Sequence, residues 1–207
     1  GNCYKVRLAL AQLDARGAFR PSAPGWTYDR GVIGTLVAPD LLDADISRLD
    51  ENTRALLSDA AIFSYPFDAD LLLALRERDP IDLAGALDEA CSAYCIVRRE
   101  GPRGPEFSWS RSATRTAFSE RLADPERRDL HFRALSHLES RWRSGVVVAE
   151  ERLADHAMGC GEPARARSHL RRGASDALSR LAFERAHALL GHALRIGEEA
   201  LSAKIQF

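Results

Sequence analysis

The chain has 207 residues, enough for one large domain or two small ones, and 45% of them are hydrophobic and 29% charged. A formal net charge of −1 gives no overall attraction to nucleic acid or to a membrane surface, so either partner would need a local patch. No apolar run approaches the roughly 20 residues of a membrane-spanning helix. The four cysteines, Cys3, Cys91, Cys95 and Cys160, lack the paired spacing of a disulfide framework, which favours reduced thiols in a cytoplasmic protein.

The first 35 residues predict a helix followed by an aromatic arm. Val6, Leu10 and Leu13 lie at i, i+4 and i+7, the spacing of a buried helical face. The Gly- and Pro-rich stretch after it contains "GWTYD", which predicts a turn and a short strand. Because the apolar pattern begins at once, this helix is either the start of a protein or the last helix of a domain that precedes it.

Three helices and then two strands are predicted in the next part of the chain, after a short amphipathic helix at 38–49. Asp50 and Asp82 are expected to cap the first and third of the three helices. The Gly/Pro turn "GPRGP" separates the two expected strands. The order is typical of a winged helix-turn-helix, with helices at 51–64, 67–78 and 82–93 and strands near 94–100 and 106–110.

From residue 111 onward the sequence predicts successive helices. Two of them carry a small residue at i, a large one at i+4 and a small one at i+7. This is the pattern by which tetratricopeptide-like helical hairpins stack. The two copies are offset by 20 residues, so successive helices resemble each other, and not complete repeats. The positions are Ala166, Leu170 and Gly173 in one helix and Ala186, Leu190 and Ala193 in the other.

This order of segments resembles the region that follows the nucleotide-binding core in bacterial STAND-type signalling ATPases, which are often fused to LuxR-type DNA-binding, nucleotide cyclase or protein kinase domains. "GNCYKVRLALAQLDARGAF" is similar to the helix that closes the lid of the ATPase, and "GWTYD" to the arm after it. "RLADHAMGCGEPARARSHLRRGASDAL" resembles the entry into the tetratricopeptide repeats. The resemblance implies a winged-helix domain between them that acts as a switch element.

Two positions depart from the family pattern. Cys3 replaces the Pro expected after Gly1 and Asn2, and Arg111 replaces the His expected after the second wing strand. Both changes argue against nucleotide sensing. Moreover, no G-x-x-x-x-G-K-[ST] motif occurs, so the phosphate cradle of such an ATPase is absent from this chain.

We therefore predict a mainly α fold with three parts: a lid-like helix and arm (1–40), a winged-helix domain (41–123) and tetratricopeptide-like hairpins (124–207). The predicted function is a non-catalytic module for regulation and protein interaction, from a STAND-type signalling ATPase or a transcriptional regulator. It needs no cofactor. The expected partner is a protein, either the nucleotide-binding domain of the parent chain or a signalling partner.

Arginines are the candidate partner-binding residues. Arg165, Arg167, Arg171 and Arg172 lie within two helical turns, where guanidinium groups could dock phosphate or an acidic segment. The alternative is a solvated helix face whose charge is offset by neighbouring carboxylates. The wing carries a second set, Arg98, Arg99 and Arg103.

Two other functions stand as alternatives. A winged helix can read DNA, but the third helix exposes Asp82, Asp88 and Glu89 and has no basic residue, which disfavours DNA recognition. An enzyme would need a pocket with a reactive Cys or His, and no catalytic motif is present.

Two pairs of residues have the i, i+4 spacing of metal ligands on a helix, Cys91 with Cys95 and His156 with Cys160. Both lack the neighbouring ligands of a metal site and are interpreted as structural.

Overall fold

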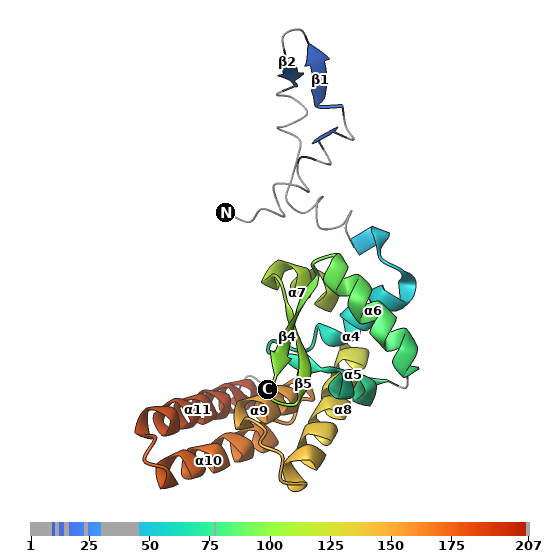
Figure 1. Cartoon of the computed structure of the whole chain (residues 1–207). Helices are drawn as coiled ribbons and strands as arrows, with labels where there is room; N and C mark the ends of the chain where they lie inside the picture. The colour runs from blue at the N-terminus through green and yellow to red at the C-terminus, as the bar shows by residue number, and fades with distance from the viewer. Residues whose placement is uncertain are drawn as a thin grey trace. The chain divides into compact units, whose positions relative to one another are not determined.

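The computed structural model describes residues 10, 13–14, 17–22, 25–29, 46–76 and 78–205. The chain forms two compact units, Gly1–Arg54 and Ala55–Phe207, each considered by itself. In the first, strands β1 (Phe19–Ser22) and β2 (Gly25–Tyr28) pair antiparallel (Figure 1). The strand predicted in "GWTYD" is confirmed as β2, whereas most of the predicted opening helix and of the helix at 38–49 lies outside the described residues.

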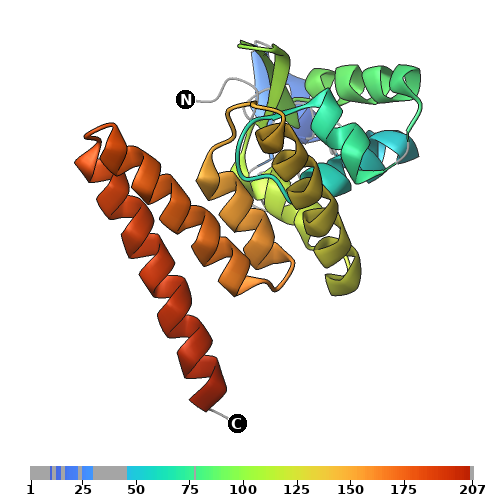
Figure 2. The same ribbon diagram turned by 90° about the horizontal axis from the view of Figure 1, so that it is seen from below.

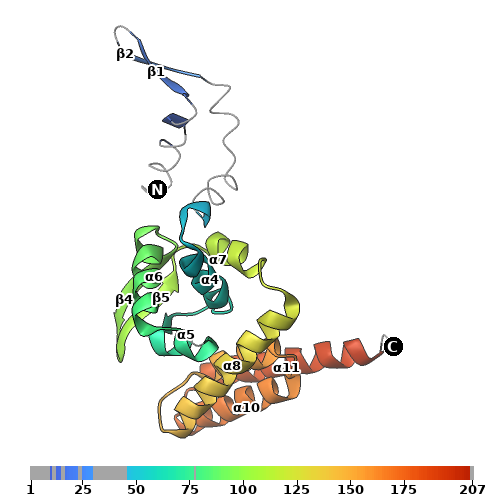
Figure 3. The same ribbon diagram turned by 90° about the vertical axis from the view of Figure 1, so that its right-hand side faces the viewer.

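The expected order of three helices and a hairpin is present. Helices α4 (Glu51–Ala60), α5 (Ala69–Leu75) and α6 (Pro80–Ser92) precede the antiparallel strands β4 (Ile96–Gly101) and β5 (Gly104–Trp109). We call these elements the three-helix core, and Figure 3 shows the hairpin beside α6. The centre of this three-helix core is apolar and buried, and it includes Phe63, Leu71, Leu75, Ile96 and Phe107.

The second predicted helix is shorter than expected because its first residues form a strand. Phe67 and Asp68 make the two-residue strand β3, which pairs with β5, so the sheet order is β3-β5-β4. Asp68 then caps α5, accepting a hydrogen bond of 2.8 Å from the N–H of Leu71.

One of the two predicted caps is confirmed and the other is wrong. Asp50 accepts a hydrogen bond from the N–H of Asn52 at 3.0 Å, as expected at the start of α4. Helix α6 begins at Pro80, not Asp82, because Asp79 caps it and proline suits the first helical position. The helix ends at Ser92, since Tyr94 adopts a φ of 55° and turns the chain into β4.

Five helices follow the hairpin: α7 (Ser112–Ser119), α8 (Asp124–Arg143), α9 (Glu150–Gly159), α10 (Pro163–Ser179) and α11 (Phe183–Ile205). From α8 onward each packs against the next, and Figure 2 shows α10 and α11 side by side as a hairpin. No helix in the described part of the chain is both long and apolar enough to cross a membrane.

The 20-residue offset seen in the sequence recurs as two equivalent turns. Gly161 and Leu181 both have a left-handed φ, 80° and 59° respectively. The backbone N–H of Glu162 donates to the carbonyl of Ala157 at 2.8 Å. Twenty residues later the backbone N–H of Ala182 donates to the carbonyl of Ala177 at 2.9 Å. The same turn therefore joins α9 to α10 and α10 to α11.

The small-large-small pattern is confirmed in α10 but only partly in α11. Ala166, Leu170 and Gly173 are all buried. In α11, Ala186 and Ala193 are buried, but Leu190 is 40% exposed and Leu189 is the buried large residue instead.

Candidate functional site

A buried polar joint connects the helical hairpins to the three-helix core. His156 of α9 is 0% exposed and lies between the loop after α4 and helix α8. Its Nε2 is 2.5 Å from Oη of Tyr65, in that loop, and its Nδ1 is 2.9 Å from Nδ1 of His131, on α8. Phe63 packs edge-on against the His156 ring at 5.5 Å between centroids. Residues from three separate parts of the chain therefore meet at one imidazole.

Burial keeps this joint uncharged. It lowers the pKa of His156 to about 3 and that of His131 to about 4, and it raises the pKa of Tyr65 above its ordinary value. Two proton arrangements satisfy both contacts: Tyr65 Oη–H donates to Nε2 of His156 while Nδ1–H of His156 donates to His131, or all the donors run in the opposite direction. Arg152 lies over the Tyr65 ring at 4.4 Å. The group is a satisfied hydrogen-bond chain and not an exposed reactive site.

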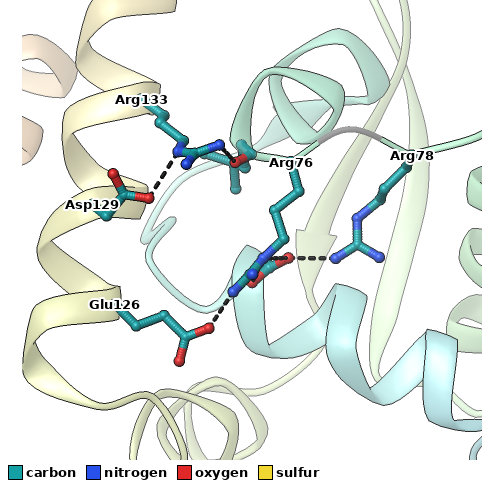
Figure 4. A network of polar contacts seen from close by, with 7 residues as sticks. Arg76, Arg78, Glu126, Asp129 and Arg133 are labelled. Atoms are coloured by element: carbon teal, nitrogen blue, oxygen red, sulfur yellow. Dashed lines mark hydrogen bonds and ion pairs between the residues drawn. The ribbon is translucent and has the colours of Figure 1, made fainter.

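A second joint, drawn in Figure 4, connects the end of α5 to α8. Asp59 is 2% exposed and forms ion pairs with both Arg76 and Arg78. Arg76 also pairs with Glu126 on α8, and Arg133 of α8 donates to the last carbonyl of α5 at 3.2 Å. The guanidinium groups of Arg76 and Arg78 are thus held by carboxylates around a cavity of about 450 Å³.

Helices α8 and α10 share a third polar joint. Glu139 of α8 is 6% exposed and accepts hydrogen bonds from Arg165 at 3.0 and 2.6 Å and from His169 at 3.0 Å. Because a buried carboxylate without partners is costly, this pairing fixes α10 on α8. Hydrogen bonds from Arg165 and its positive charge outweigh the effect of burial and keep the pKa of Glu139 below its ordinary value.

The four arginines predicted on α10 fall into two pairs. Arg165 binds Glu139, and Arg172 lies over the Trp142 ring at 3.9 Å and donates to His169 at 2.8 Å. Arg167 and Arg171 are exposed to solvent. Arg165 and Arg172 therefore contact Glu139 and Trp142 of α8, and only Arg167 and Arg171 are displayed outward.

The wing arginines are displayed on the hairpin. Arg98 and Arg99 are exposed on β4, where Arg99 is opposite Glu106 of β5. Arg103 is exposed in the turn. Whether either set of arginines binds a partner stays a prediction.

The structure describes both pairs that have the i, i+4 spacing of metal ligands, and Cys3 lies outside the described residues. Cys95 lies beyond the end of α6, so it does not share a helical face with Cys91, as the spacing had implied. Burial raises the pKa of Cys160 to about 11, which leaves its thiol protonated at neutral pH. Among the residues that the structure describes, no three His, Cys, Asp or Glu side chains are grouped so that they could hold a metal ion.

Sequence reasoning missed the joint at His156. Tyr65 and His131 are 91 and 25 residues from it and share no motif with it. One indirect signal exists: Gly159 ends α9, and a Cβ there would lie 2.3 Å from the His131 ring. A glycine at a helix–helix crossing indicates close approach, although it does not identify the neighbour.

Comparison with known proteins gives a structural likeness. No protein-family model matches the sequence, and no curated protein matches it. A crystal structure from Pyrococcus horikoshii does match: a Signal Transduction ATPase with Numerous Domains (STAND) protein with a tetratricopeptide repeat sensor. The fold resembles that of a STAND protein. The match has a TM-score of 0.56 at 18% identity and covers 79% of this chain and 23% of the neighbour, so this chain spans about a quarter of that protein.

At this level of identity the likeness concerns the fold alone. It confirms the predicted mainly helical architecture with helical hairpins and the resemblance to a STAND-like, tetratricopeptide-like fold. The winged-helix assignment, the LuxR-type connection and the three-part division at 40 and 123 stay predictions.

Proposed function

We propose that this chain is a non-catalytic regulatory module of a STAND-type signalling protein. Its hairpins α8–α11 bind a protein, and its three-helix core, a winged-helix domain within 41–123, passes the binding event to a nucleotide-binding domain or a signalling partner. The observation that carries the proposal is the buried joint at His156, which couples α8, α9 and the core through one hydrogen-bond chain. A displacement of α9 cannot leave the core unchanged, because Tyr65 would lose its partner.

The chemistry of the described side chains supports a binding role over catalysis. His156 is fully buried and held neutral, and Cys160 is held as a thiol. General-base or nucleophilic chemistry needs such groups to be reachable and suitably ionised.

The exposed face of α6 argues against DNA binding by this helix. Ile81, which is 81% exposed, lies beside Asp82, and Asp88 is also exposed. A helix in the major groove needs donors near a polyanion, and carboxylates there would be repelled.

Site-specific photo-crosslinking in the native cell tests the proposal. A benzophenone side chain at Leu194 of α11, which is 67% exposed, reports on the hairpins, and one at Ile81 is the matched control on α6. We expect one protein to crosslink from Leu194 and not from Ile81. Hydrogen exchange with that protein bound should then show increased protection of the loop around Tyr65.

Two results would overturn the proposal. The first is protection confined to the hairpins, with the Tyr65 loop unchanged, since the joint would then transmit nothing. The second is nanomolar, salt-sensitive binding of a DNA duplex by the chain, which would favour a DNA-binding regulator.

A further inference from the structure

The segment between α8 and α9, residues 146–149, has no helix or strand and ends at Ala149 with extended dihedrals. Val147 is 98% exposed, an unusual position for a β-branched apolar side chain, whereas Val148 beside it is 8% exposed. The N–H of Val146 donates to the carbonyl of Arg141 at 3.0 Å, and the carbonyl of Ala149 accepts from the N–H of Arg152 at 3.0 Å. Between these two anchors, Val147 and Val148 make no backbone hydrogen bond to any other residue that the structure describes. The segment therefore offers donors and acceptors in the manner of an edge strand.

A groove of about 550 Å³ lies along this segment and reaches α10 and α11. Trp142, 38% exposed, and the valines provide apolar surface in it. Three guanidinium groups and two carboxylates also line it: Arg172, Arg180 and Arg185 with Glu150 and Asp176.

The ion pairs in this groove are weak enough to be replaced. Arg180 pairs with Asp176 at 3.1 Å, but their side chains are 75% and 50% exposed. Arg185 donates to Glu151 at 3.4 Å, with side chains 53% and 43% exposed, and lies 3.9 Å from Glu150, at the limit of an ion pair. The two exposed pairs, Arg180–Asp176 and Arg185–Glu151, each contribute about 0–1 kcal/mol, so an incoming carboxylate can compete for the guanidinium donors.

Arg172 is the fixed cation of the groove. Its guanidinium lies 3.9 Å above the Trp142 ring centre, and its buried Nε has no hydrogen-bond partner among the described residues. Together the groove presents an aromatic surface, three guanidinium groups against two carboxylates in its lining, and the backbone of Val147 and Val148, which has no backbone partner among the described residues.

We propose that this groove binds an extended acidic peptide segment of a partner protein. The peptide main chain pairs with the N–H and C=O of Val147 as an added strand, an apolar side chain covers Trp142, and carboxylates engage Arg180 and Arg185. Adjacent N–H and C=O groups complement a polypeptide main chain, whereas a nucleic-acid backbone offers acceptors only, so a peptide is favoured over a nucleic acid. This inference rests on the proposed function and names the chemistry of its partner.

Fluorescence anisotropy on the full chain tests it with a defined probe. The probe is a labelled eight-residue peptide of alternating Asp and Leu, because an extended strand places all carboxylates on one face and all leucines on the other. We expect binding in the range of tens of micromolar that weakens with salt. The double variant Arg180→Glu/Arg185→Glu should weaken it at least tenfold, and Arg167→Glu/Arg171→Glu, an equal charge change on exposed residues of α10 that do not line the groove, should not.

Substitutions at Val147 test the proposed main-chain pairing. Because its side chain is exposed, substituting it should affect the fold little. Val147→Pro removes the N–H and should weaken the peptide about tenfold, whereas Val147→Thr keeps it and should bind normally. Three results would overturn the inference. The first is that Arg167→Glu/Arg171→Glu weakens peptide binding as much as Arg180→Glu/Arg185→Glu does. The others are that a Lys/Leu peptide or an oligothymidine strand binds as tightly as the Asp/Leu peptide, and that the Asp/Leu peptide does not bind at all. If the peptide fails while Leu194 still crosslinks a protein and the Tyr65 loop gains protection, the proposed function stands and only the groove assignment is lost.

Discussion

Replacing Gly159 with alanine tests how tightly α8 and α9 are packed. A Cβ at this position would lie 2.3 Å from Cγ and Nδ1 of His131, well inside van der Waals contact. The ring cannot move away freely, because its Nδ1 is hydrogen-bonded to the fully buried His156. Two costs therefore combine in Gly159→Ala, a steric one and the loss of a buried hydrogen bond.

The magnitudes predict which effect wins. Overpacking a core position costs about 1–3 kcal/mol, and a buried polar group that loses its partner costs about 1–3 kcal/mol. Against this, alanine stabilises a helix over glycine by about 0.5–1 kcal/mol. We expect Gly159→Ala to lower the free energy of unfolding by about 1–5 kcal/mol, measured by urea titration with circular dichroism.

A matched control separates sterics from helix propensity. Gly85 lies inside α6, and a Cβ added there would have no neighbouring atom within 4 Å, so Gly85→Ala should stabilise the chain by about 0.5–1 kcal/mol. In a His131→Ala background the ring is absent, and the penalty of Gly159→Ala should largely disappear. A Gly159→Ala protein at least as stable as the parent would refute the close packing of α9 on His131.

Three further predictions concern the buried polar groups. Tyr65→Phe should lower the free energy of unfolding by about 1–3 kcal/mol, because it leaves Nε2 of His156 without a partner; an unchanged urea midpoint would contradict the bond. Since the pKa of His156 is about 3 in the folded chain and about 6.5 unfolded, the unfolded state takes up this proton first, and stability should fall as pH drops from about 6.5 toward 3, by up to about 1.4 kcal/mol per pH unit. In His156→Gln the free energy of unfolding should fall less steeply between pH 6.5 and 5 than in the parent. Parallel curves of unfolding free energy against pH for the two proteins would contradict the low pKa of His156. Glu139→Gln should lower the free energy of unfolding by about 1–3 kcal/mol, because it weakens the contact with Arg165. Since the pair is buried, 1 M salt should leave the free energy of unfolding of both the parent and the variant unchanged. Equal free energies of unfolding for the parent and the variant would contradict the prediction.

Local sequence signals determined the elements of this fold well. Asp50 marks the start of α4, and the offset of 20 residues between apolar patterns corresponds to the equivalent turns at Gly161 and Leu181. These succeed because caps, turns and helical faces depend on residues a few positions apart. Where the local signal was ambiguous, as with Asp79 and Asp82 before and inside α6, the neighbouring proline decided the start of the helix.

The buried polar contacts join residues that are close in space but far apart along the chain. The sequence by itself determined a mainly helical chain, with three helices, a hairpin and stacked helices in that order, and a run of arginines on α10. Only the tertiary structure decided that Arg165 is held by Glu139 while Arg167 is displayed, since spacing along a helix does not reveal which neighbour covers a face. It alone brought Tyr65 to His156 across 91 residues, because burial and hydrogen bonding between distant segments are properties of the packed chain.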